Sequence, residues 1–215
     1  KKLGIFSLGS IGCRHLKVAR DFRSDINIVA IRSGFGKDTK EEKFADSIFH
    51  SFEDAINYGI ECAIIASPTV FHVKQAINLM ENGIHVLIEK PLSNSLENIN
   101  QLVKIEKKSK LVGLIGYCLR YELAALKFNE ILNYKKIGEI LNVKVECSSY
   151  LPEWRKGFDY RDSISAKAEL GGGVLTELSH ELDYIRWIFG DPKIKFVETG
   201  KFSNLKLFFF IFFGE

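Results

Sequence analysis

A short apolar run leads into a turn of small residues in Leu3-Gly4-Ile5-Phe6-Ser7-Leu8-Gly9-Ser10-Ile11-Gly12. The run predicts a β-strand, and the pattern from about Ile11 to Phe22 predicts a helix directly after the turn. A strand that opens into a helix in this way directs backbone N–H groups toward a pyrophosphate. The stretch therefore predicts the first βα unit of a dinucleotide-binding domain.

The turn keeps two of the three glycines of the G-x-G-x-x-G dinucleotide fingerprint. Ser7 stands where the first glycine would make the tight turn. Gly9 is present where the phosphate approaches the backbone, and Gly12 where the helix packs against the strand. A plain strand-to-helix connection is the competing interpretation, but the position at the start of an alternating β/α chain favours cofactor binding. The predicted cofactor-binding residues of the turn are Ser7, Gly9, Ser10, Ile11 and Gly12.

Residues 1–119 predict an α/β fold of the Rossmann type, with a doubly wound parallel sheet. Apolar runs at 26–31, 62–66, 85–88 and 111–116 supply further strands. Three helices are expected between them: one after Ser51 that ends near Gly59, one from Val70 to Glu81 capped by Thr69, and one from Leu96 to Lys108 capped by Ser95.

Chemically active residues follow two of these strands. Ser67-Pro68-Thr69 comes after one strand, with His72 three residues on, and Glu89-Lys90-Pro91 comes after the next. The carboxyl ends of parallel strands are where α/β sheets bind their ligands. The candidate cofactor contacts here are therefore Ser67, Pro68, Thr69, His72, Glu89 and Lys90. A surface ion pair of little energetic value is an equally good interpretation of Glu89 and Lys90.

The end of the second strand bears on the choice of cofactor. NAD sites place a carboxylate about 20 residues beyond the fingerprint, where it binds the ribose 2′-OH, whereas NADP sites place arginine nearby. The chain has Arg32 and Ser33 there, and no carboxylate at the strand end. This favours NADP, with NAD as the alternative. An arginine that simply reaches solvent is the competing interpretation.

The pattern changes near Arg120, and residues 120–215 predict a smaller α+β domain for substrate binding and oligomerisation. A helix is expected over 122–134, and the alternation from Ile140 to Cys147 predicts an antiparallel strand with one solvated face. A long polar and aromatic loop follows, and in it Tyr160 and Arg161 are candidate substrate contacts, with Arg120.

Three glycines at 171–173 precede a helix predicted over 174–189. Glu177, His180 and Asp183 fall at spacings of three on this helix, so they share one face. A histidine between two carboxylates suits acid/base chemistry, although a lone histidine is more often structural. No second histidine lies at ligand spacing, so no metal site is predicted.

Composition argues against several partners. The formal net charge is only +3, and the four cysteines are scattered without metal-ligand spacing. No secretory signal precedes the first strand. We therefore expect a cytoplasmic protein without nucleic-acid or membrane partners. The aromatic tail at 205–215 is too short to span a bilayer. It is either a buried strand or the product of a damaged or prematurely ended reading frame.

These motifs, in this order, resemble the Gfo/Idh/MocA oxidoreductase family. The likeness rests on residues 7–12, 67–72, 89–91, 116–120 and 171–190. It implies an N-terminal Rossmann domain and a C-terminal α/β domain whose open antiparallel sheet helps to form dimers or tetramers. The implied activity is NAD(P)-dependent oxidation or reduction of sugars, sugar nucleotides, inositols and similar polyols.

The resemblance also implies roles for individual residues. Lys90 matches the lysine that contacts substrate and cofactor, and His180 matches the acid/base histidine. Asp183 is expected to orient the histidine ring, and Glu177 stands near the position of the family's aspartate. This agrees with the chemistry, since oxidation of a hydroxyl needs a base while hydride leaves for the nicotinamide, and a lysine cation favours the developing alkoxide.

The match fades after about Thr199, whereas the family continues further. We therefore expect a shortened copy of such an oxidoreductase, and a homo-oligomer if the C-terminal sheet is complete. A missing part of the sheet would expose apolar strand edges. The competing hypothesis is a non-catalytic remnant or a dinucleotide-binding regulatory protein.

Overall fold

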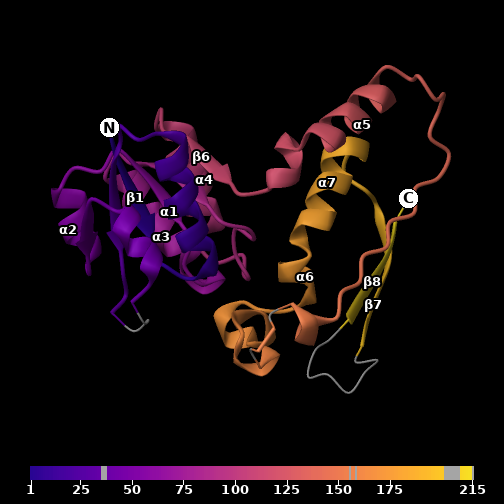
Figure 1. The fold of residues 1–215 in the computed structure, drawn as a ribbon. Helices are drawn as coiled ribbons and strands as arrows, with labels where there is room; N and C mark the ends of the chain where they lie inside the picture. Colours follow the sequence, from indigo (N-terminus) through magenta and orange to yellow (C-terminus); the bar gives the residue numbers. More distant parts are fainter. Residues whose placement is uncertain (35–37, 155, 158, 201–208, 215) are drawn as a thin grey trace. The chain divides into compact units, whose positions relative to one another are not determined.

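The computed structural model describes residues 1–34, 38–154, 156–157, 159–200 and 209–214 (Figure 1). The chain divides into two compact units, Lys1–Gly116 and Tyr117–Glu215. In the described part of the chain, no helix combines the length and the apolar character needed to cross a bilayer.

The first unit is built on a parallel sheet of six strands (Figure 1). Their spatial order is β3 (Ser47–Phe49), β2 (Asn27–Ile31), β1 (Lys2–Phe6), β4 (Cys62–Ile65), β5 (His85–Ile88) and β6 (Gly113–Ile115). This is the 3-2-1-4-5-6 order of a Rossmann fold, which confirms the predicted fold class. The sequence analysis missed β3, because three residues are too few to show a periodic pattern.

Helices cover both faces of this sheet. They are α1 (Ser10–Phe22), α2 (Phe52–Asn57), α3 (His72–Glu81) and α4 (Ile99–Lys108). On one face Leu16 of α1 packs against Ile5 and Ile28. On the other face Phe6 and Val29, the next residues along the same two strands, join a larger cluster with α2, α3 and α4. Successive side chains of a strand point to opposite faces, so each strand contributes to both layers.

Helix starts were predicted with mixed success. Ser51 caps α2 as expected, because its hydroxyl accepts the Asp54 N–H at 3.0 Å. Thr69 does not cap α3, since Thr69–Phe71 forms a separate 3₁₀ turn and α3 begins at His72. The Ser95 cap is also wrong: its hydroxyl accepts the N–H of Glu97 in a local turn, so α4 begins only at Ile99. Leu96, predicted as the first residue of this helix, lies outside it and is 90% exposed.

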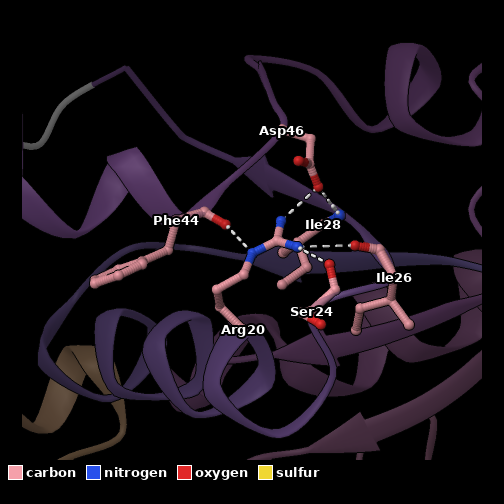
Figure 2. A network of polar contacts seen from close by, with 6 residues as sticks. All are labelled: Arg20, Ser24, Ile26, Ile28, Phe44 and Asp46. Atoms are coloured by element: carbon pink, nitrogen blue, oxygen red, sulfur yellow. Dashed lines mark hydrogen bonds and ion pairs between the residues drawn. The ribbon is translucent and has the colours of Figure 1, made fainter.

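A network around Arg20 ties the end of α1 to the start of β2 and to the segment before β3 (Figure 2). Its Nη2 lies 2.6 Å from Asp46 Oδ2, which also accepts the Ile28 N–H at 2.7 Å. These two donors hold the pKa of Asp46 below its usual value. Backbone carbonyls accept from the rest of the guanidinium, each at 3.1 Å: Ser24, Ile26 and Phe44.

The second unit contains α5 (Leu123–Asn133), α6 (Val174–Glu177), α7 (Ser179–Phe189) and an antiparallel pair, β7 (Ile194–Gly200) and β8 (Phe209–Gly214). The predicted helix over 174–189 is interrupted at Leu178, which separates α6 from α7. Of the aromatic tail, residues 209–214 form a strand, while 205–208 and 215 lie outside the described residues.

The antiparallel strand predicted from Ile140 to Cys147 is wrong. Residues 138–150 form neither helix nor strand, and Leu141 is 92% exposed. Alternation of apolar and polar side chains specifies which face of a strand would be buried, but it does not supply the neighbouring strand. Among the described residues no strand pairs with this segment, so its backbone forms no hydrogen-bonded ladder and is not a β-strand.

We predict that Arg20→Met destabilises the first unit, because several charge-assisted hydrogen bonds are lost together. The expected loss in the free energy of unfolding is about 1–3 kcal/mol, measured by urea denaturation. Arg23→Met is the matched control. In the part of the chain that the structure describes, the Arg23 side chain pairs only with the exposed Asp25, and such surface pairs add little stability. Equal losses of unfolding free energy in the two variants would contradict a stabilising role for the Arg20 network.

Candidate functional site

The Gly-rich turn has room for a ligand at one glycine and none at the other. A Cβ on Gly12 would lie 1.9 Å from the Ser7 carbonyl oxygen, so no side chain fits there. A Cβ on Gly9 would meet no described atom within 4 Å. Gly9 is also the N-cap of α1, which has neither a side-chain cap nor an acidic residue in its first turn. The helix N-terminus therefore presents backbone donors and positive dipole to an approaching anion.

Ser7 takes the place of the first fingerprint glycine and also its backbone conformation. Its φ is +76°, in the left-handed region that glycine adopts without strain. Its N–H donates to the Ile31 carbonyl at 2.8 Å, which joins the ends of β1 and β2. A non-glycine residue in this conformation costs about 1–3 kcal/mol and persists only where its surroundings enforce it. The serine thus keeps the geometry of the turn.

Arg32 at the end of β2 contacts two carboxylates. Its Nη1 lies 2.5 Å from Asp38 Oδ1 and 2.8 Å from Glu42 Oε1, and its side chain is 9% exposed. The interpretation that Arg32 simply reaches solvent is therefore wrong. Glu42 is itself fixed, because its Oε1 accepts the N–H of Thr39 at 3.0 Å in a capping box. Ser33 is exposed beside this cluster.

Asp38 and Glu42 were missed by the sequence analysis. The spacing Thr39-x-x-Glu42 signals the start of a helix, and the 3₁₀ helix Lys40–Phe44 begins there. That signal locates the Glu42 carboxylate along the chain. It carries no information about the arginine that the carboxylate binds.

The segment after β4 is held from within by His72. This imidazole is 1% exposed; Nε2 lies 2.8 Å from the Ser67 carbonyl oxygen and Nδ1 lies 2.9 Å from that of Pro91. His72 therefore links the segments that follow β4 and β5 at this edge of the sheet. Ser67 donates its hydroxyl to Gln75 at 2.7 Å, and Thr69, beside Pro68, is buried.

The Glu89 carboxylate, after β5, binds a histidine from α1. Its Oε1 lies 2.5 Å from His15 Nε2, and its Oε2 accepts the Lys90 N–H at 3.1 Å. The side chains of His15 and Glu89 are 22% and 15% exposed, so this contact is largely removed from solvent. Burial opposes ionisation of Glu89, but the bonds from His15 and Lys90 outweigh it and lower its pKa.

His15 was also missed, and no sequence signal connects it with Glu89, 74 positions away. The site residues of the first unit nevertheless gather as predicted on one edge of the sheet. The Gly-rich turn, Arg32, Ser67 and Glu89 follow the carboxyl ends of β1, β2, β4 and β5. This is the edge at which open α/β sheets bind their ligands.

In the second unit Arg120 and Asp183 form a two-pronged ion pair. Nε and Nη2 of Arg120 each lie 2.8 Å from one carboxylate oxygen of Asp183. The expectation that Asp183 orients the ring of His180 is therefore wrong, because both of its oxygens bind the arginine. The ring instead contacts Glu181, whose Oε1 lies 3.2 Å from His180 Nε2.

Glu181, which the sequence analysis passed over, is the centre of this arrangement. Its carboxylate also accepts from Tyr184, and burial together with this bond raises the pKa of Tyr184 to about 12. His180 Nδ1 is buried and has no hydrogen-bond partner among the described residues. An imidazole can both accept and return a proton near neutral pH, so the ring has the chemistry of an acid/base group.

The remaining predicted site residues of this unit belong to other segments of the chain. Glu177 belongs to α6, on the other side of the break at Leu178. The Arg161 guanidinium binds Asp159, with Nε at 2.9 Å from Oδ1, and Tyr160 is partly exposed beside it. Within the described ranges, no group of three or more histidine, cysteine or acidic side chains is arranged to hold a metal ion.

Comparisons with known proteins agree with this geometry. Residues 1–117, more than half of the chain, match the Gfo/Idh/MocA oxidoreductase family with its NAD-binding Rossmann fold. Residues 125–204 match the Gfo/Idh/MocA C-terminal domain.

Individual relatives are dehydrogenases of sugars and inositols. Glucose-6-phosphate 3-dehydrogenase of Bacillus subtilis is 24% identical over 192 residues, which cover 88% of this chain and 54% of that protein. Inositol 2-dehydrogenase of Salmonella typhimurium is 24% identical over 198 residues, covering 88% and 55%. The chain therefore spans about half the length of these relatives.

A solved structure shows the same fold. Scyllo-inositol dehydrogenase of Lactobacillus casei, with bound NAD(H) and scyllo-inositol, aligns with a TM-score of 0.71 at 19% identity. The alignment covers 94% of this chain and 60% of that one. From the family match, the order of the sheet and the glycine turn, we conclude that this chain belongs to the Gfo/Idh/MocA oxidoreductase family.

Proposed function

We propose that this protein transfers a hydride between a nicotinamide cofactor and a hydroxyl or keto carbon of a sugar, sugar nucleotide or polyol. The observation that carries the proposal is the turn before α1, where Gly9 leaves space and the helix N-terminus lacks a cap. The dehydrogenase relatives and the NAD(H)-bound neighbour support it.

The residues of the first unit fit a dinucleotide. Backbone N–H groups of Ser10, Ile11 and Gly12 would hold the pyrophosphate, and Ser67 and Pro68 would border the nicotinamide half. When bound, the nicotinamide supplies the hydride acceptor or donor. The chain itself must supply orientation, a base for the hydroxyl proton and a cation for the developing oxyanion.

We assign these tasks to His180 and Lys90. His180 takes the hydroxyl proton as the general base. The Lys90 ammonium stabilises the alkoxide oxygen. Asp183 keeps Arg120 in place for substrate contact, and Tyr160, Arg161 and Glu177 are further substrate-contact or catalytic candidates.

For the cofactor we now propose NAD rather than the NADP that Arg32 and Ser33 suggested. Arg32 is already bound by Asp38 and Glu42, so the residues that the structure describes place two negative charges beside one positive charge. A 2′-phosphate would meet an excess of negative charge there, whereas a 2′-hydroxyl can donate to a carboxylate.

We propose that the second unit, from about residue 120, supplies the substrate contacts and the homo-oligomer interface of a complete C-terminal sheet. We further propose that the protein acts in the cytoplasm without nucleic-acid or membrane partners.

Gly9→Ala should leave the fold intact and weaken NADH binding. The added methyl group meets no atom of the protein, but it lies where the pyrophosphate must approach the backbone. We expect an unchanged melting temperature and at least about a tenfold rise in the NADH dissociation constant, measured by fluorescence titration. Gly113→Ala, at the start of β6, is the control for glycine replacement, because an added Cβ there makes only ordinary van der Waals contacts. Unchanged NADH affinity in Gly9→Ala would remove the turn from the cofactor site.

The wild-type chain should bind NADH more tightly than NADPH. Asp38→Asn removes one of the two carboxylates that bind Arg32, which lowers the negative charge near the cofactor ribose. The dissociation constant for NADPH divided by that for NADH should therefore fall by about tenfold. Asp21→Asn removes the same charge from an exposed position on α1 and should leave the ratio unchanged. Tighter binding of NADPH by the wild-type chain would contradict the choice of NAD.

Turnover separates the enzyme from a dinucleotide-binding regulatory protein. With a panel of sugars, sugar nucleotides and inositols, cofactor absorbance should report oxidation, and His180→Ala and Lys90→Met should each lower kcat by about 10²–10⁴-fold. Lys74→Met, an exposed substitution on α3, should retain activity. A folded wild-type chain that binds NADH but converts no member of the panel would favour the regulatory alternative.

A further inference from the structure

The His15–Glu89 hydrogen bond joins two segments whose relative position matters for the proposed reaction. His15 lies on α1, the helix whose N-terminus faces the cofactor, and Glu89 directly precedes Lys90. The same carboxylate accepts the Lys90 N–H, so a single side chain connects the helix with the backbone of the lysine.

The surroundings of Glu89 allow little movement. A Cβ on Gly116 would lie 3.3 Å from Glu89 Oε2, so a larger residue at 116 would press on the carboxylate. On the other side of Lys90, the Pro91 carbonyl is held by His72. The backbone at Lys90 is therefore held on both sides by a histidine from a helix.

Stability alone is a poor reason for this arrangement. Polar side chains that leave solvent must be desolvated, and well-packed apolar residues in their place often stabilise a fold as much or more. What a hydrogen-bonded carboxylate provides is a fixed direction, since its oxygens accept only from donors at defined positions.

We propose that His15 is a positioning residue, which acts through Glu89 to fix the backbone of Lys90 relative to the helix that carries the Gly-rich turn. It touches neither substrate nor reacting atoms. The catalytic role of this positioning rests on the proposed function, in which the Lys90 ammonium group must lie close to the reacting oxygen.

The test uses the full chain labelled with ¹⁵N and follows hydrogen exchange of the Lys90 amide by NMR. His15→Leu removes the donor, and exchange at Lys90 should quicken at least tenfold. His15→Gln restores a donor and should return the rate to within threefold of wild type. The amides of Ala66 and Val86, which donate to Phe6 and Val112, should be unaffected. His50→Leu, at an exposed histidine, is the control.

Unchanged exchange at Lys90 in His15→Leu would overturn the proposal. So would an equal acceleration at Ala66 and Val86, which would mark general loosening, and so would a failure of His15→Gln to restore the rate. Should His15→Leu not fold, Glu89→Gln, which keeps the shape of the side chain, carries the same test.

Kinetics give a second measurement. His15→Leu should lower kcat at least tenfold while the NADH dissociation constant changes less than threefold; loss of NADH affinity with kcat retained would contradict positioning. A wild-type chain without any turnover would refute the proposed function, and the Lys90 exchange rates would still decide the role of His15.

Discussion

The close approach of α1 to the turn before it is the constraint on which the first unit depends. The Ser7 carbonyl oxygen occupies the space that any side chain at residue 12 would need. Only glycine allows the helix to start this near the strand end, and only that start brings the helix dipole to the carboxyl edge of the sheet. The left-handed backbone of Ser7 and its bond to Ile31 belong to the same constraint.

Much of this fold could be predicted because buried parallel strands are apolar on both faces and appear as continuous runs in the sequence. Errors arose where a local interaction competed with a regular pattern. Ser95 looks like a helix cap, yet its hydroxyl closes a turn to Glu97. In residues 140–147 apolar and polar side chains alternate as in a strand. Alternation is a property of one segment, whereas a β-ladder also needs a second strand beside it.

The candidate site likewise has features that the sequence predicts and features that it does not. Positions defined by the backbone, such as Gly9 and Gly12, follow from spacing because the turn lies within one short segment. Side-chain partners do not: His15 and Glu89 are 74 positions apart, and Arg120 and Asp183 are 63 apart. Arg32 shows the consequence. Its position in the sequence suggested a phosphate site, and the sequence did not indicate the two carboxylates that contact it among the described residues.

Both edges of the parallel sheet are short. β3 and β6 have three residues each, so either edge presents few unpaired backbone groups. A strand of another molecule would gain only a few hydrogen bonds by adding there, and long exposed edges are the usual templates for such addition. The Rossmann sheet is thereby protected against growing from one molecule into the next, and it gains this protection from the length of its outermost strands rather than from charges placed along them.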